Sequence, residues 1–273
     1  MICFKNAQKI DFIPLLDRAF HYGDGCFTTA RFHQNVMELE FLHRARLKLA
    51  AECLYLKFNF DVLEQSLDVL KQQFLSLNGT LKIILSRGEG DRGYAMPEHD
   101  ADLYVLFYPK ATDAFQPEFI HSGVLEQAIG LAMPNLVGLK TLNRLEQVML
   151  KKEAQEKGWL EALVTDVQGS IVEGVSSNCF IQINNTWITP ELRYNGVHGV
   201  MRAEILSRMH QQGIRCEQRY IDMEEIRNFQ SVFFCNALSP MKIVETLNQQ
   251  PLNTQSCVEL FQTLNLSQFN SHV

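Results

Sequence analysis

Residues 162–189, ALVTDVQGSIVEGVSSNCFIQINNTWIT, decide the fold class. Short apolar runs alternate in this stretch with two groups of turn-forming residues, Val167-Gln168-Gly169 and Asn184-Asn185. Glycine and asparagine readily adopt the backbone conformations that join neighbouring antiparallel strands. The stretch therefore predicts an antiparallel meander, not the regular strand–helix alternation of a parallel sheet.

Helical and strand patterns extend outward from this meander in both directions. Apolar spacing predicts helices over residues 42–54, 60–74, 143–157, 200–212 and 257–264. Gly158 directly follows the third of these helices and is a typical residue after a helix end. Short apolar runs predict further strands over residues 36–39, 81–86, 102–108, 124–132 and 231–235. Because hairpins and helices interleave irregularly, we expect an α+β fold.

The run DLYVLFY, from Asp102 to Tyr108, is nearly continuous in apolar residues and predicts a central strand buried on both faces. The following stretch, Pro109 to Gly123, has weak periodicity and is the best candidate for a linker. We therefore expect two domains. They are a small N-terminal α/β domain over residues 1–110 and a larger C-terminal domain over 122–273, which carries Lys140, joined by a linker over 111–121.

Composition excludes several classes of protein. The chain has 273 residues, of which 46% are hydrophobic and 21% charged, with a net charge of −6. This composition excludes bulk disorder, and the acidic balance argues against a nucleic-acid partner. No apolar run reaches the roughly 18 residues that a membrane helix needs, and residues 1–11 do not resemble a signal peptide. Seven scattered cysteines without a C-x-x-C pair favour reduced thiols in the cytoplasm and no metal site.

The segment Gly88–Gly93 matches the pattern G-x-G-x-x-G after a predicted strand. A dinucleotide site also requires a helix to begin there, so that the pyrophosphate meets the helix N-terminus. The chain instead continues through Pro97 into another predicted strand. We therefore expect a glycine-rich loop in a long hairpin.

Arg46 lies within the apolar stripe of the predicted helix over residues 42–54. At about 100° per residue, this stripe contains Leu42, Ala45, Leu49 and Cys53. One interpretation is a guanidinium whose stem packs along the core while its head reaches water or a carboxylate. The alternative is a cation that binds a buried anion such as a phosphate.

Glu173 and Lys140 also lie in apolar surroundings. Glu173 shares a predicted strand face with Ile171, so it is either an edge carboxylate in water or one that holds a protonated ring nitrogen. Lys140 ends the apolar stretch that begins at Leu136. It is either an ordinary surface lysine or a desolvated amine suited to Schiff-base chemistry. With Arg46, these residues supply the amine, carboxylate and phosphate cation that a pyridoxal phosphate site needs.

Two longer motifs carry a family resemblance. Glu173-Gly-Val-Ser-Ser-Asn178-Cys-Phe180, then Thr189, then Val197-His-Gly199-Val-Met-Arg202 resembles the signature of the fold-type IV pyridoxal phosphate enzymes. This family includes branched-chain and D-amino-acid aminotransferases and aminodeoxychorismate lyases. Trp187 departs from the pattern, which has an aliphatic residue at that position.

Three further segments match the family in the same order. Asp17–Gly25, His43-Arg-Ala-Arg46-Leu47 and Lys140-Thr-Leu-Asn143 resemble its N-terminal motif, its phosphate-binding helix and its lysine motif. The resemblance spans Asp17 to Pro240 and implies a two-domain fold similar to D-amino-acid aminotransferase. Within the family, four segments are most similar to the aminodeoxychorismate lyases: Gly23 to Arg31, Ser86 to Tyr94, Lys140 to Gln147, and Cys235 to Pro240.

The resemblance implies a role for each matching residue toward pyridoxal 5′-phosphate. Lys140 would bind the cofactor covalently and move the proton, Glu173 would pair with the pyridine nitrogen, and Arg46 would bind the phosphate. The remaining phosphate-side groups would be the backbone of Val200 and Met201 at a helix start and a second loop at Asn236 and Ala237. Aminotransferases of the family have hydroxyl residues in that loop, whereas Ala237 offers only its backbone.

The resemblance also implies a substrate side. Arg92 and Tyr94 match positions that bind a substrate carboxylate in D-amino-acid transaminases, where the neighbouring subunit supplies this loop, so a homodimer is implied. Phe27 and Thr29 would line the pocket, and the Thr29 hydroxyl would assist proton transfer. The implied activity is a lyase that forms 4-aminobenzoate and pyruvate from 4-amino-4-deoxychorismate. The alternatives are a D-amino-acid or branched-chain aminotransferase and a non-catalytic relative that kept the fold.

Overall fold

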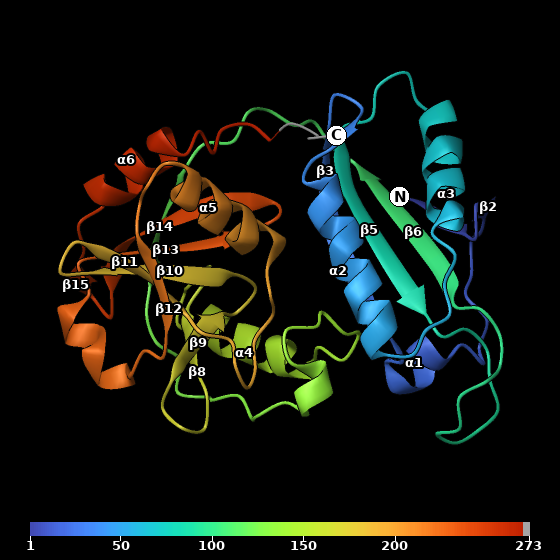
Figure 1. Cartoon of the computed structure of the whole chain (residues 1–273), viewed down its shortest axis with the longest axis horizontal. Coiled ribbons are helices and arrows are strands. Elements are labelled where there is room, and N and C mark those ends of the chain that lie inside the picture. Colours follow the sequence, from blue (N-terminus) through green and yellow to red (C-terminus); the bar gives the residue numbers. More distant parts are fainter. Residues whose placement is uncertain (270–273) are drawn as a thin grey trace. The chain divides into compact units, whose positions relative to one another are not determined.

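The computed structural model describes residues 1–269 and divides into two compact units (Figure 1). Unit 1 comprises Met1–Asp113, Leu139–Asn143 and Phe269, and unit 2 comprises Ala114–Gly138 and Arg144–Gln268. Each unit has its own sheet with helices. The α+β fold class expected from the sequence is confirmed.

Within the described residues, unit 1 contains a six-stranded sheet in the order β2-β1-β6-β5-β3-β4. Every neighbouring pair in it is antiparallel. The strands are β1 (Ile2–Lys5), β2 (Gln8–Lys9), β3 (Gly25–His33), β4 (Val36–Met37), β5 (Gly79–Ser86) and β6 (Asp102–Pro109). The central position of β6 and its buried residues confirm the expectation drawn from DLYVLFY. A loop with no helix joins β5 to β6, as expected for Gly88–Gly93.

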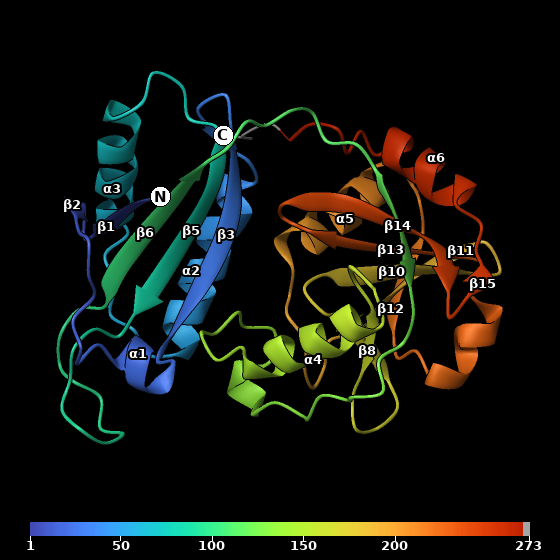
Figure 2. The same ribbon diagram turned by 180° about the vertical axis from the view of Figure 1, so that it is seen from behind.

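Unit 1 also contains α1 (Arg18–Tyr22), α2 (Glu40–Cys53) and α3 (Asp61–Gln72). Figure 1 shows α2 and α3 in front of the sheet, and Figure 2 shows the opposite sheet face from behind. The expected apolar stripe of α2 was wrong: its buried residues are His43, Leu47, Ala50 and Ala51. The face of α2 is rotated because His43 is buried against Thr28 of β3, which supplies its hydrogen-bond partner.

Among the residues that the structure describes, unit 2 has a mixed seven-stranded sheet in the order β12-β11-β10-β13-β14-β15, with β7 paired parallel to β14. Its strands are β7 (Glu118–Ser122), β10 (Asn178–Ile183), β11 (Thr186–Pro190), β12 (Cys216–Arg219), β13 (Ser231–Asn236), β14 (Ser239–Leu247) and β15 (Gln250–Pro251). A separate hairpin joins β8 (Leu163–Thr165) to β9 (Ile171–Gly174). The helices are α4 (Leu145–Glu156), α5 (Val200–Gln211) and α6 (Gln255–Thr263), with 3-10 turns at Pro134–Leu136 and Met223–Asn228.

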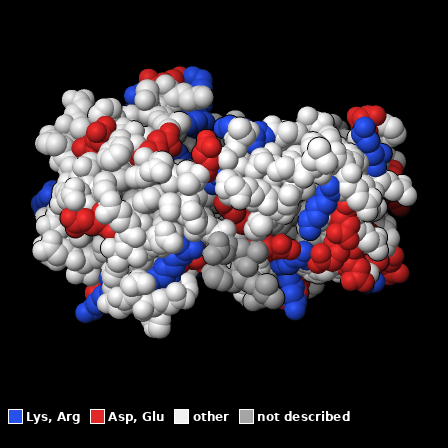
Figure 3. Space-filling model, turned by 90° about the horizontal axis from the view of Figure 1, so that it is seen from above, with Lys and Arg blue, Asp and Glu red and all other residues white. Residues whose placement is uncertain are grey.

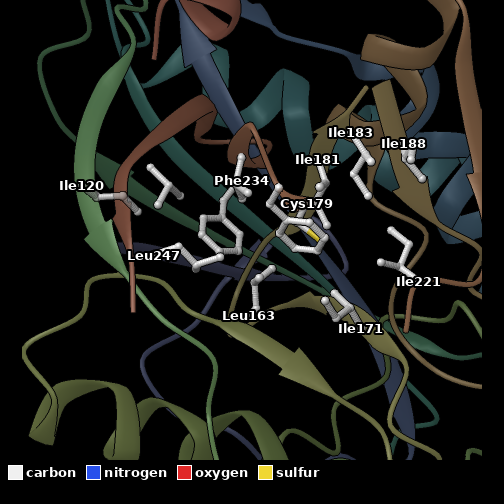
Figure 4. Close-up of a cluster of buried hydrophobic side chains, with 13 residues drawn as sticks. Ile120, Leu163, Ile171, Cys179, Ile181, Ile183, Ile188, Ile221, Phe234 and Leu247 are labelled. Atoms are coloured by element: carbon white, nitrogen blue, oxygen red, sulfur yellow. The ribbon is translucent and has the colours of Figure 1, made fainter. Parts of the chain in front are cut away.

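The antiparallel strands of the meander pack over an apolar core (Figure 4). Phe234 of β13 and Cys179 and Ile181 of β10 are fully buried there, together with Leu163 of β8. Each large apolar side chain buried in this way stabilises the fold by about 1.5–3 kcal/mol. This core holds the β9–β10 segment, which carries Glu173, in a fixed position.

The structure differs from the sequence expectations at three further places. The expected linker contains β7, which pairs with β14 of the sheet. Residues 124–132 form isolated bridges instead of a strand, at Val124 and Ile129. Lys140 belongs to unit 1 and not to the C-terminal part, because Thr141 bridges to Cys26 of β3. Each difference depends on a partner segment far away in the sequence.

The described residues contain no helix that is long and apolar enough to cross a membrane. Acidic and basic side chains lie next to one another on the face drawn in Figure 3.

Candidate active site

Lys140 is fixed to β3 within unit 1. The Phe27 N–H donates to the Lys140 carbonyl at 2.9 Å, and the Lys140 Nζ lies 4.8 Å from the centroid of the Phe27 ring. A cation at this distance over an aromatic face is stabilised by the ring. Strand alternation puts Thr29 on the same half-buried face as Phe27. Unit 1 thus brings together Lys140, Phe27 and Thr29.

A second lysine, Lys82, also lies beside the Phe27 ring and was not predicted from the sequence. Its Nζ lies 4.8 Å from the Phe27 ring centroid, and Lys82 is the register partner of Thr29 across β3 and β5. The only signal for Lys82 in the sequence is its place in the alternation of polar and apolar residues along β5. The pairing register that aligns Lys82 with Thr29 is visible only in the assembled sheet.

Arg46 lies at the edge of the buried face of α2. Its Nη1 donates to the Thr28 Oγ1 at 3.4 Å, and the same oxygen is 2.6 Å from the Nδ1 of His43. Burial, together with the charge of Arg46, lowers the pKa of His43 to about 3. His43 is therefore neutral at physiological pH and adds no second positive charge beside Arg46.

Glu173 is a buried carboxylate of unit 2, at the end of β9. Its Oε2 accepts a hydrogen bond from the N–H of Val197 at 2.9 Å. Val197 in turn bridges to Gly138, which precedes Lys140 by two residues. Gly138 has a φ of 79°, and a Cβ there would lie 2.6 Å from the His198 ring, so only glycine fits.

Arg144, which was not singled out from the sequence, lies within range of the Glu173 charge. Burial lowers the pKa of Arg144, and the charges of Glu173 and Glu146 oppose this shift. The charges of Arg144 and Glu173 therefore act on each other within unit 2.

The helix α5 begins at Val200, three residues after Val197. Its N-cap residue is Gly199, which has no side chain to cap the first N–H groups. The buried residues Val200 and Met201 follow it. The first N–H groups of a helix lack intrahelical acceptors and attract anions. A Cβ at Gly199 would lie 1.9 Å from the Oδ1 of Asn178, while the Asn178 Nδ2 donates to the Val197 carbonyl at 2.9 Å. The β9–β10 turn therefore positions the start of α5.

Asn236 ends β13, and Ala237 follows it in the tight turn to β14. The Asn236 Oδ1 accepts from the N–H groups of Leu238 and Ser239, both at 3.0 Å. Its Nδ2 donates to the Ser177 Oγ at 3.1 Å. Unit 2 thus connects Glu173, the start of α5 and this turn through one short segment, residues 173–178.

Arg92 and Tyr94 are exposed in the β5–β6 loop of unit 1. Gly93, between them, is held from both sides: its carbonyl accepts from the Arg18 Nη1 at 2.9 Å and its N–H donates to the Tyr22 hydroxyl at 3.0 Å. The Tyr22 and Tyr94 rings lie 5.6 Å apart. The loop thus has a defined anchor although its two candidate side chains face water.

The cysteines offer no reactive thiol near these residues. Burial raises the pKa of Cys26 to about 12, against the opposing charge of Arg46, and it raises the pKa of Cys179 even further. Both thiols are protonated and inert at neutral pH. The described residues also contain no group of histidine, cysteine, aspartate and glutamate suited to a metal ion.

Comparison with known proteins gives one consistent result. The model of the amino-transferase class IV family matches residues 25–246. An aminodeoxychorismate lyase of Vibrio harveyi is 30% identical over 239 residues, covering 85% of this chain and 86% of that protein. A D-alanine aminotransferase of Bacillus licheniformis is 26% identical, with 89% and 85% covered. The crystal structure of 4-amino-4-deoxychorismate lyase from Pseudomonas aeruginosa matches with a TM-score of 0.85 and 30% identity, over 95% of this chain and 96% of that one.

Proposed function

Because the chain belongs to the class IV aminotransferase family of pyridoxal phosphate enzymes, we propose that it converts 4-amino-4-deoxychorismate to 4-aminobenzoate and pyruvate. One observation carries the choice of reaction. The sequence relative at 30% identity and the solved structure at a TM-score of 0.85 both have aminodeoxychorismate lyase names, and each match covers most of both chains.

The donor set of the chain fits pyridoxal phosphate. Lys140 supplies a primary amine, Glu173 a buried carboxylate whose position is fixed by Val197, and Arg46 a guanidinium beside a neutral histidine. The uncapped start of α5 adds N–H groups at Val200 and Met201 for a phosphate. These groups match the three charged or reactive parts of the cofactor: aldehyde, ring nitrogen and phosphate.

Each residue has a defined task in the proposed reaction. Lys140 would hold the cofactor through its amine, and the same amine takes the proton from the substrate carbon that bears nitrogen. Glu173 keeps the ring nitrogen protonated, and Arg46 binds the phosphate. When bound, the cofactor supplies an electron sink for the carbon that loses its proton. Asn236 and the backbone of Ala237 form the second phosphate-side loop.

The atoms balance without an added oxidant or reductant. The C–H bond next to the amine breaks, and the C–O bond to the enolpyruvyl side chain breaks after it. The side chain leaves as the enolate of pyruvate, which takes up the released proton at its methylene carbon. The ring becomes aromatic, which supplies much of the driving force. The chain's residues therefore mainly hold groups in position and move one proton.

The substrate side is formed by four residues. Phe27 and Thr29 line the pocket, with the Thr29 hydroxyl assisting the proton transfer by Lys140, and Arg92 and Tyr94 bind a carboxylate of the substrate. We propose that the protein is a homodimer of the cytoplasm and that Arg92 and Tyr94 of each subunit act in the site of the neighbouring subunit. The exposure of Tyr94, at 87% of its full area, agrees with a loop that acts outside its own subunit.

A second candidate is an aminotransferase that uses the same residues, and the D-alanine aminotransferase relative at 26% identity supports it. Such an enzyme would return an amine from an amino acid in a second half-reaction. A protein that keeps the fold without catalysis is a third candidate, which the presence of Lys140, Glu173 and Arg46 disfavours.

The deciding experiment couples the purified protein to an enzyme that forms aminodeoxychorismate and measures 4-aminobenzoate and pyruvate. We expect both products in equal amounts. A parallel reaction with D-alanine or a branched-chain amino acid plus 2-oxoglutarate measures amine transfer. Robust transfer without 4-aminobenzoate would replace the lyase assignment by the aminotransferase. Failure to take up pyridoxal phosphate would support the non-catalytic relative.

A further inference from the structure

Glu161 is a buried carboxylate of unit 2 that none of the proposed tasks uses. It lies between α4 and β8 and is 1% exposed. Its Oε1 accepts from the Ser176 N–H at 2.9 Å, and its Oε2 accepts from the Ser176 and Ser177 hydroxyls at 2.8 and 2.6 Å. Within residues 1–269, no lysine, arginine or histidine forms an ion pair with it. Hydrogen bonds alone therefore compensate its loss of water.

All three donors belong to the turn between β9 and β10. Glu173 lies at one end of this turn and Asn178 at the other. The turn is closed by a hydrogen bond from the Gly174 N–H to the Ser177 carbonyl at 2.6 Å. The conformation of the turn therefore determines the positions of the Glu173 carboxylate and the Asn178 side chain. Both side chains bind the backbone of Val197 and so position the start of α5.

The same turn reaches the β13–β14 loop through one hydroxyl. The Ser177 Oγ donates to Glu161 at 2.6 Å and accepts from the Asn236 Nδ2 at 3.1 Å. A hydroxyl has one hydrogen, so donation to Glu161 directs its lone pairs toward the Asn236 amide. The charge of Glu161 strengthens this chain of bonds, because an ionised acceptor polarises the hydroxyl that it binds.

We propose that Glu161 is a positioning residue for the cofactor, which holds the ring-nitrogen carboxylate Glu173 and the phosphate-side loop at Asn236 in one fixed arrangement through Ser176 and Ser177. This inference deepens the proposed function and rests on it. Glu161 touches neither cofactor nor substrate. Its effect passes through the turn at residues 173–178. The position of this turn determines how well Glu173, the start of α5 and the loop at Asn236 fit the cofactor.

The experiment measures binding of pyridoxamine 5′-phosphate to the cofactor-free protein by calorimetry. This probe has the ring nitrogen and the phosphate but forms no bond with Lys140, so it reports on positioning alone. Glu161→Gln keeps the shape of the side chain and removes its charge. We expect it to raise the Kd about tenfold, as is typical when a residue that orients direct ligands is changed.

Glu153→Gln is the matched control in the same unit. Glu153 is also a buried carboxylate, at 8% exposure, and it accepts from the N–H groups of Glu126 and Gln127 at 2.8 and 3.1 Å, neither of which belongs to residues 173–178. A merely structural role would make the two variants equivalent. We expect Glu153→Gln to lower the thermal midpoint of the free protein while its Kd stays within about twofold of the wild type.

Ser177→Ala tests the link to Asn236 in case Glu161→Gln folds poorly. This variant removes one hydroxyl and should also raise the Kd. The double variant with Glu161→Gln should raise the Kd by less than the two separate effects combined, because both changes break the same series of hydrogen bonds. Wild-type binding with equal Kd values for Glu161→Gln and Glu153→Gln would overturn this inference alone. A wild-type protein that binds neither the probe nor pyridoxal phosphate would overturn the proposed function and this inference together.

Discussion

The Nζ of Lys140 lies 4.8 Å from the centroid of the Phe27 ring, and the backbone of the same two residues is joined by a hydrogen bond of 2.9 Å from the Phe27 N–H to the Lys140 carbonyl. The lysine is therefore held at both its main chain and its side chain. An amine that is fixed over an aromatic face and partly shielded from water is well placed to hold a cofactor and to move a proton.

Lys140→Ala should reduce formation of 4-aminobenzoate at least about 10³-fold, because it removes the group that transfers the proton. The visible absorption band of the cofactor-loaded protein should disappear with it. Lys82→Ala is the matched control, since Lys82 also lies 4.8 Å from the Phe27 ring but has no assigned chemistry. The assignment of Lys140 fails if the band and the activity follow Lys82 instead.

Glu173→Gln should lower kcat about 10²–10³-fold, as expected when a fixed charge no longer stabilises the developing charge of the reaction. The amide oxygen can still accept the Val197 N–H, so the fold should change little, whereas the binding of pyridoxamine 5′-phosphate should weaken. Steady-state kinetics and calorimetry measure the two effects separately. The exposed Glu191→Gln serves as control. Unchanged kcat in Glu173→Gln would contradict its role at the ring nitrogen.

Tyr22→Phe removes the hydroxyl that accepts the Gly93 N–H at 3.0 Å and so loosens the loop of Arg92 and Tyr94. We expect KM for the substrate to rise about 2- to 10-fold, the loss of one net hydrogen bond, with little change in kcat. The exposed Tyr55→Phe should leave both constants unchanged. A fall in kcat at constant KM would indicate that the loop acts in the chemical step and not in binding.

His43 makes the stability of unit 1 depend on pH. Burial holds its pKa at about 3 in the folded protein, below the value of about 6.5 expected when unfolded. The unfolded chain therefore binds more protons at mildly acidic pH, so this contribution to stability is present above pH 6.5 and is lost as the pH falls toward 3. The loss amounts to about 2 kcal/mol between neutral pH and pH 5.

His43→Gln should flatten this dependence in urea unfolding measured at neutral pH and at pH 5, whatever its own stability. The exposed His210→Gln is the control and should keep the wild-type slope. Equal slopes in the wild type and in His43→Gln would show that His43 is not buried in its neutral form.

Local features of the sequence determined several elements correctly. The helix over 143–157 was expected to end at Gly158, and α4 runs from Leu145 to Glu156 with Gly158 at a φ of 72°. The turn at Asn184-Asn185 has both residues at positive φ, as expected for a hairpin. These features depend on neighbouring residues alone, so a single sequence contains the information needed.

Register and long-range pairing could not be obtained in this way. The buried face of α2 was misjudged because His43, a polar residue, is buried by its bond to Thr28. The strand β7 was expected to be a linker because only β14, more than a hundred residues later, gives it a partner. Likewise Lys82 reaches Phe27 only through the pairing of β3 with β5.

The α+β class and the candidates Lys140, Glu173 and Arg46 follow from patterns in the sequence, because charged residues stand in apolar runs within recognisable motifs. The contacts that hold these residues become visible in the folded chain. It anchors Lys140 on Phe27, fixes Glu173 through Val197, and buries Glu161 beneath residues 176 and 177. The physical reason is that a hydrogen bond needs its partners within about 3 Å, and chain folding, not sequence distance, decides which groups come that close.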